Sequence, residues 1–234
     1  MRFGPVKSQA QQASDAVFRA RDLLVRQRTQ CINAIRGHLA EYGWVAPQGV
    51  CYVERLMRRV DDPAEDLPEA ARTILKVLAE MLRVLDEQIV VLDAEIGRRA
   101  KEDPVARRLM TIPGVGPATA AAIVALAAEA FRRGRDFAAW VGLTPLQKST
   151  GGKQKLGRIT KMGQRTLRRF LVIGASAVIK QALLRGAPAG SSLGQMLARK
   201  PRMLVAVALA NKKARIVWAL MARGGTYRAP GAAA

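Results

Sequence analysis

Two long stretches of this chain repeat their apolar residues every seven positions. In residues 8–42 one column of such residues is flanked by a second column one position earlier. The two columns are Phe18, Val25, Ile32 and Leu39, and Val17, Leu24 and Cys31. Adjacent columns at this spacing form an apolar stripe on one face of a helix. The pattern predicts a helix over residues 8–42, and the Gly and Pro residues of 43–49 end it.

The second stretch has the spacing of a coiled-coil seam. Its apolar residues alternate steps of three and four, and valines at every seventh position are expected to widen the stripe on one side. The seam is Leu75, Leu78, Leu82, Leu85, Ile89, Leu92 and Ile96, and the valines are Val77, Val84 and Val91. We expect the seam to pack against residues 17–39 as an antiparallel hairpin. A contact of the seam with a second copy of the chain is the alternative, and both hold if the hairpin itself pairs with a second copy. We therefore expect a homo-oligomer.

Together with shorter patterns, these stretches predict an all-α fold class. We expect a long antiparallel, coiled-coil-like helical hairpin followed by a basic helical domain with a helix-hairpin-helix-like turn. Aromatic residues make up only 5% of the chain, so the core must be aliphatic. Short helices are expected at 50–60, 104–111, 137–143, 164–184, 193–199 and 201–223, with an acidic loop at 61–68 and a polar, basic loop at 146–163. The expected domains are 1–103, 104–228 and a disordered tail, 229–234.

The charges of the chain are divided very unevenly. Asp136 is the last acidic residue, and the 98 residues after it contain 18 Lys and Arg, in a chain of net charge +21. A folded region without carboxylates cannot neutralise itself, so its counter-ions must come from outside, and a polyphosphate such as DNA supplies them. The same region cannot build a carboxylate metal site, and no cofactor is expected to be bound by this chain. The basic residues of the last helices are expected on a solvated face.

A glycine turn precedes this basic region. Gly114 and Gly116 follow a short helix and lead into an Ala-rich one. Glycines allow a tight turn and close approach of a phosphate, which the free N–H groups of the next helix can hold. An ordinary glycine turn between packed helices is the alternative, and the basic region nearby favours phosphate contact.

The basic loop and the helix after it supply the remaining candidates for nucleic-acid binding. These are Lys148, Lys153, Lys155, Arg158, Lys161, Arg165, Arg168 and Arg169. Basic loops carry function more often than packing. Ser149 lies among them, and taken alone it fits a turn residue that hydrogen-bonds its own backbone.

Five motifs in one order make this part of the chain specific. They are Ile-Pro-Gly-Val-Gly at 112–116, Phe-Ala-Ala-Trp-Val-Gly-Leu-Thr-Pro at 137–145, Gln-Lys-Ser-Thr-Gly-Gly-Lys at 147–153, Leu-Gly-Arg-Ile-Thr-Lys-Met-Gly at 156–163 and Leu-Arg-Arg at 167–169. This order closely resembles the carboxy-terminal half of the insertion sequence 110 family of transposases. Residues 20–29 are similar to the family's linker helix, so the resemblance covers almost the whole chain.

The resemblance implies a serine nucleophile that attacks a DNA phosphodiester, here Ser149, with Thr150 beside it. It also implies an upstream RuvC-like domain whose acidic residues bind a divalent metal such as Mg²⁺. We expect that domain to be missing and the chain alone to be inactive. DNA is the expected partner, and the resemblance implies a guide RNA as a further candidate partner, since some relatives use one. The alternative is a non-catalytic nucleic-acid-binding remnant that interferes with a full-length transposase.

The ends and the cysteines of the chain indicate its compartment. No apolar run reaches membrane-spanning length, and no signal peptide follows Met1. Cys31 and Cys51 form neither a metal spacing nor a disulfide framework. We therefore expect a cytoplasmic, nucleoid-associated protein without a membrane partner.

Overall fold

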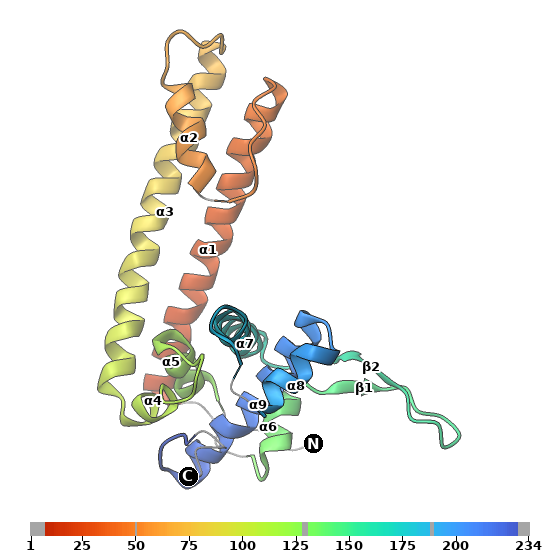
Figure 1. Cartoon of the computed structure of the whole chain (residues 1–234). Helices are drawn as coiled ribbons and strands as arrows, with labels where there is room; N and C mark the ends of the chain where they lie inside the picture. The colour runs from red at the N-terminus through yellow and green to blue at the C-terminus, as the bar shows by residue number, and fades with distance from the viewer. Residues whose placement is uncertain (1–7, 50, 128–130, 188–189, 229–234) are drawn as a thin grey trace. The chain divides into compact units, whose positions relative to one another are not determined.

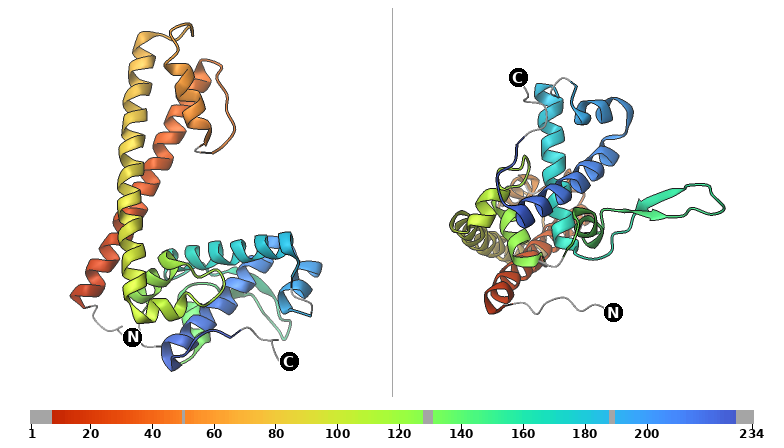
Figure 2. Two further views of the ribbon diagram at one scale, coloured as in Figure 1. Left: turned by 60° about the vertical axis from the view of Figure 1, so that its left-hand side comes forward. Right: turned by 90° about the horizontal axis from the view of Figure 1, so that it is seen from below.

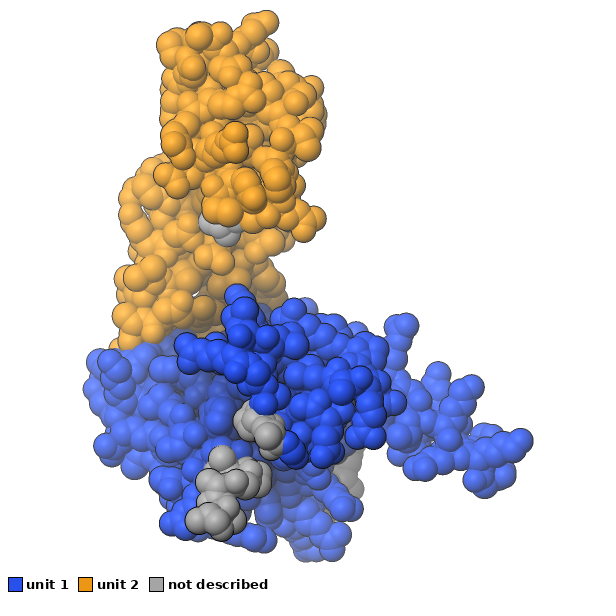
Figure 3. Space-filling model, viewed as in Figure 1, with its two compact units in different colours: residues 1–15, 96–234 blue, residues 16–95 orange. Residues whose placement is uncertain are grey.

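Helices make up most of the chain in the computed structural model, which describes residues 8–49, 51–127, 131–187 and 190–228. The described residues form nine helices and one β-hairpin (Figure 1). They divide into two units: residues 16–95, and the described parts of 1–15 and 96–234 (Figure 3). The segment 229–234, predicted to be disordered, lies outside the described residues.

The two heptad stretches form two long antiparallel helices, α1 (Gln9–Glu41) and α3 (Glu69–Glu102) (Figures 1 and 2). Their register is marked by ion pairs of Arg21 with Asp93 and of Arg28 with Asp86, the latter at 3.1 Å. The positions on α1 rise as those on α3 fall. The seam residues Leu75, Leu82, Leu85 and Ile89 are buried, at most 8% exposed. The predicted helical hairpin is therefore confirmed.

A third helix, α2 (Cys51–Val60), adds to this core where the chain turns back. It buries Val53, Leu56 and Val60 in one cluster with residues of α1 and α3. A short helix at 50–60 was predicted, but its contribution to the core was not. The buried cluster is therefore shared by all three helices.

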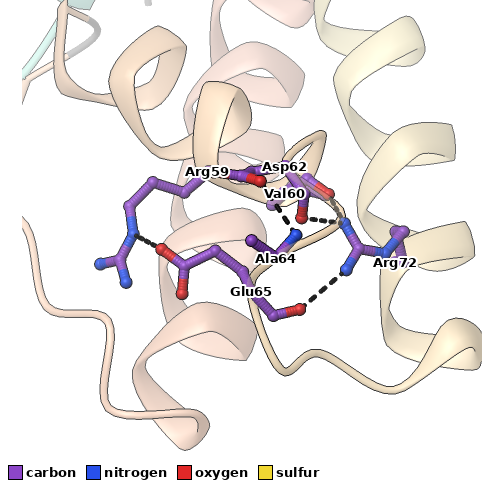
Figure 4. Close-up of polar contacts among 6 residues, drawn as sticks. All are labelled: Arg59, Val60, Asp62, Ala64, Glu65 and Arg72. Carbon is purple, nitrogen blue, oxygen red and sulfur yellow. Dashed lines mark hydrogen bonds and ion pairs between the residues drawn. The ribbon is translucent and has the colours of Figure 1, made fainter.

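The acidic loop between α2 and α3 is closed by arginine contacts (Figure 4). The Nη1 and Nη2 atoms of Arg72 donate to the carbonyl oxygens of Asp62 and Glu65, each at 3.1 Å. The Nε atom of Arg59 donates to Glu65 Oε1 at 2.7 Å. The two arginines thus hold the loop through its backbone carbonyl oxygens and through the Glu65 carboxylate.

The valines expected to widen the buried stripe are exposed instead. Val77, Val84 and Val91 are 64%, 41% and 59% exposed. The seam faces α1, so the flank beside it points to solvent. Ile74 and Met81 share this flank, at 53% and 48% exposed. Together these five residues form a second apolar row along α3, at heptad spacing, which we call the outer seam.

The second unit is built around two helices, α7 (Arg165–Arg185) and α9 (Arg202–Arg223). The helices α4 (Pro104–Leu109), α6 (Gly134–Trp140) and α8 (Ser192–Arg199) pack on α9, and α5 (Pro117–Leu126) packs on α4 and α7. Small and aliphatic residues fill the core, among them Ala120, Ile123, Leu171, Ala175, Ala210 and Ala214. The prediction of an aliphatic core is confirmed, and small residues allow the helices to approach closely.

The segment predicted as a basic loop is a β-hairpin. Strands β1 (Pro145–Gln147) and β2 (Leu156–Ile159) pair antiparallel. Gly151 and Gly152 both have positive φ, +54° and +78°, which is the requirement of a tight two-residue hairpin turn. The hairpin projects from the second unit as an arm (Figures 1 and 2).

Candidate nucleic-acid interface

The arm carries most of the predicted binding residues and exposes them. Lys148, Lys153, Lys155, Arg158 and Lys161 all lie on the solvent-exposed surface of the hairpin or its base. The backbone is fixed by pairing: Lys148 N donates to Lys155 O at 2.9 Å, and Lys153 N donates to Thr150 O at 3.0 Å. The structure therefore brings these five predicted residues together on one projecting element.

Ser149 lies two residues before the Gly151–Gly152 turn and is exposed. Its Oγ accepts a hydrogen bond from Lys155 N at 3.0 Å. This bond to nearby backbone is what a structural serine in a turn would make. It also fixes the position of Oγ while leaving the hydroxyl proton free to be donated. Both interpretations of Ser149 agree with this geometry.

The pairing register separates the polar side chains into two faces. Successive side chains of a strand point to opposite faces, and paired residues share one. Thr150 is bridged to Lys153, and Lys148 pairs with Lys155, so these four share a face. Ser149 alternates to the opposite face. Leu156 is paired with Gln147, and a register shift between Pro145 and Gln147 interrupts the regular alternation along β2 before Arg158 is reached. The pairing therefore assigns no face to Arg158, which lies exposed in β2.

The base of the arm is held by Arg168. Its Nη1 donates to Val141 O at 2.8 Å and to Met162 O at 2.9 Å. Burial, and then the charge of Arg165, lower the pKa of Arg168 from its ordinary value. Arg168 was predicted to bind nucleic acid, and the structure places it half-buried, joining α7 to both ends of the arm. Arg165 and Arg169 lie exposed in the first turns of α7.

The glycine turn lies on the side of the unit away from the arm (Figures 1 and 2). Gly114 has φ +78°, and a Cβ there would lie 2.3 Å from Gly174 O of α7. Packing alone therefore requires a glycine at 114. Gly116 is exposed and is the N-cap of α5, and no side chain caps that helix. The first-turn N–H groups of α5 remain available to an anion.

One lysine that was expected on a solvated face is buried. Lys213 of α9 is 3% exposed, and its Nζ donates to Gly174 O at 2.9 Å. A detail of the sequence indicates this: Lys213 continues the buried series Ala206, Ala210 and Val217, at steps of four, three and four. It occupies a core position in the helical repeat.

Neither a metal cluster nor a membrane span is found in the part of the chain that the structure describes. Within those residues no three His, Cys, Asp or Glu side chains gather as a metal site would require, so a divalent ion of the type the family implies has no fitting ligand set there. None of the described helices combines the length and the apolar character needed to cross a bilayer.

Comparison with known proteins covers both candidate regions. Residues 106–186, which include the glycine turn and the arm, match the model of the "Transposase IS116/IS110/IS902 family". A Sinorhizobium fredii transposase is 44% identical over 232 residues, which are 97% of this chain and 59% of that protein. A family 20 transposase of Pseudomonas aeruginosa is 42% identical over 97% of this chain and 69% of its own length. The transposase for insertion sequence element IS1328 of Yersinia enterocolitica is 34% identical, with 97% and 68% covered. The chain thus spans about three fifths to two thirds of these relatives, in their carboxy-terminal part. It belongs to the IS116/IS110/IS902 family of transposases.

Proposed function

We propose that this chain is the DNA-binding portion of a transposase and presents Ser149 as the nucleophile for strand transfer. The observation that carries the proposal is the arm: a basic hairpin that projects from a carboxylate-free region and displays a serine beside its turn. Membership of a transposase family supports DNA strand transfer as the reaction. The positive charge of the exposed lysines attracts the arm to a phosphate backbone.

The chemistry of the proposed step is a phosphoryl transfer. Ser149 Oγ forms a bond to phosphorus, the P–O bond to the leaving strand breaks, and the hydroxyl proton passes to a base. Cations near the phosphate stabilise the charge of the transition state, and we assign this role to Arg158, which is exposed in β2. No Asp, Glu or His follows Asp136, so the base comes from outside residues 137–234.

The two faces of the arm give Ser149 and Thr150 different surroundings. Thr150 shares its face with Lys148, Lys153 and Lys155. We assign that face to the DNA backbone, because phosphate contacts position a protein without requiring chemistry. Ser149, on the opposite face, is the nucleophile under this assignment.

DNA binding is tested by the salt dependence of affinity. A fluorescent duplex is titrated with the 234-residue chain at rising salt, with structured RNA as competitor. Each phosphate contact releases counter-ions, so the logarithm of affinity should fall linearly with the logarithm of salt concentration. A response independent of salt would contradict DNA binding. Stronger competition by RNA than by duplex would assign the surface to a guide RNA.

The nucleophile is tested by covalent capture. The chain is incubated with element-end DNA and Mg²⁺, with and without the acidic domain of a relative added in trans. We expect a protein–DNA adduct only in the supplemented reaction, lost in Ser149→Ala and retained at reduced level in Thr150→Ala. A full yield of adduct from Ser149→Ala would show that the assignment is wrong. Binding without any adduct in the supplemented wild type would favour the non-catalytic alternative.

We also propose self-association through the outer seam of α3. Five large apolar side chains, Ile74, Val77, Met81, Val84 and Val91, are 41–64% exposed at the spacing of a coiled coil. Contiguous exposed apolar rows mark interaction sites in soluble proteins. A second copy supplies an identical row, so a homo-oligomer is the simplest occupant.

A further inference from the structure

Lys213 carries a buried cation directly behind the glycine turn. Its Nζ donates to Gly174 O at 2.9 Å, and a Cβ added to Gly114 would lie 2.3 Å from this nitrogen. The ammonium therefore touches the backbone of Gly114, at the point where that backbone meets α7. An ammonium has three donors, and the bond to Gly174 uses one of them.

Among the residues that the structure describes, no carboxylate of the surrounding helices is placed to neutralise this charge. The helices packed on α9 are α4, α6, α7 and α8, and their one acidic residue is Asp136, exposed in the first turn of α6. Their other charged groups are Arg107, Arg108, Arg135, Arg165, Arg168, Arg169, Lys180, Arg185 and Arg199. Burial lowers the pKa of Lys213 to about 8, which is the expected response of an ammonium without a counter-charge.

A buried charge without a partner destabilises a fold, and a hydrophobic residue of similar volume would avoid that cost. Lysine at this position therefore has a use other than packing. The ammonium adjoins Gly114 of the Gly114–Gly116 turn, and no side chain caps the first-turn N–H groups of α5, the helix that follows this turn. A phosphate held there would be the missing counter-charge.

We propose that Lys213 is a buried determinant of nucleic-acid binding, whose charge is neutralised by a backbone phosphate held at the Gly114–Gly116 turn. The inference rests on the DNA binding proposed above and adds to it a specific residue and a specific phosphate site. Lys213 acts through the turn: it supplies positive potential from behind Gly114, while the N–H groups of α5 face the anion.

The competing explanation is a structural pin, in which the bond from Lys213 to Gly174 holds α9 against α7. The two explanations predict opposite signs for stability. Lys213→Met keeps the stem and removes the charge. If the charge of Lys213 serves to bind a DNA phosphate, Lys213→Met melts at the same or a higher temperature than the wild type but binds DNA more weakly. If Lys213 is a pin, the melting temperature of the variant falls.

The experiment compares three forms of the full chain: wild type, Lys213→Met and Lys180→Met. Lys180 is an exposed lysine of α7, so its substitution removes one charge without touching the turn. Melting temperature and affinity for a fluorescent duplex are measured at neutral pH. We expect Lys213→Met to bind about tenfold more weakly than Lys180→Met, because a low-dielectric site strengthens the interaction of charge with phosphate.

A second measurement uses the wild type alone. The Cε resonance of Lys213, identified by its loss in Lys213→Met, is followed through a pH titration with and without a short duplex. We expect the duplex to raise the pKa of Lys213. An unchanged pKa in the duplex-bound chain, or equal affinities of the two Met variants, would overturn the inference. Failure of the wild type to bind any duplex would instead overturn the proposed function, which keeps the two failures distinct.

Discussion

Leu75 offers the sharpest test of the three-helix core of residues 16–95. It is 1% exposed and packs in one cluster with Leu39 of α1 and Val60 of α2. Its neighbour Ile74, on the same helix, is 53% exposed. Aspartate at either position adds the same charge to the same turn of α3. The pair therefore isolates the effect of burial.

The expected loss at Leu75 approaches the whole stability of this unit. Truncating a buried leucine costs about 2–5 kcal/mol, and an unpaired carboxylate at that place adds several more. The unit Ala16–Glu95 should have a free energy of unfolding of about 4–12 kcal/mol at the usual value per residue. Leu75→Asp should therefore unfold residues 16–95, whereas Ile74→Asp should change the free energy of unfolding by less than about 1 kcal/mol.

Circular dichroism and hydrogen exchange measure this directly. In Leu75→Asp the helical signal should fall, and amides of α1 and α2 within residues 16–60 should lose protection, while those of α7 and α9 keep it. Ile74→Asp should match the wild type in both measurements. A Leu75→Asp variant with native helicity and protection would refute the packing of α1, α2 and α3 around this residue.

Three further predictions follow from the arm, the outer seam and Lys213. Arg158→Gln should lower the yield of covalent adduct more than duplex affinity, whereas Lys153→Gln, on the face assigned to the DNA backbone, should do the reverse; equal effects would contradict this division of roles. Val84→Asp should shift the chain toward monomer in sedimentation while keeping the native helical signal, and an unchanged distribution would exclude the outer seam as the contact. Burial lowers the pKa of Lys213 from 10.5 to about 8, so between pH 8 and pH 10.5 the unfolded chain binds more protons than the folded one. The free energy of unfolding should therefore rise with pH across this range, by up to about 3 kcal/mol. Denaturant titrations of wild type and Lys213→Met should show this rise only in the wild type.

The helices could be predicted because each one buries a stripe of apolar residues on one face. The patterns placed a helix at 8–42, and α1 covers Gln9–Glu41. They placed helices at 164–184 and 201–223, and α7 and α9 begin and end within one residue of these bounds. Apolar periodicity records which side of a helix meets the core, so it is strong wherever one face is buried.

The arm escaped prediction for the same physical reason. Residues 146–156 are exposed on both faces, so burial imposes no alternation on their side chains. Backbone pairing and the turn at Gly151 and Gly152 hold the hairpin instead. The sequence could identify Ser149 and its basic neighbours, but it could not assign them to faces, because faces depend on the pairing register.

Helix α7 relates the two candidate phosphate contacts of the second unit to each other. Gly174 meets the turn at Gly114, and Arg168 holds both ends of the arm. The two residues are six positions apart, which corresponds to about 9 Å along a helix. Since α7 is a regular helix between them, the turn and the base of the arm move as one body. A DNA backbone bound at the turn would therefore have a fixed position relative to the base of the arm. Ser149, whose Oγ is held by its bond to Lys155, would then approach one particular phosphate rather than sample many.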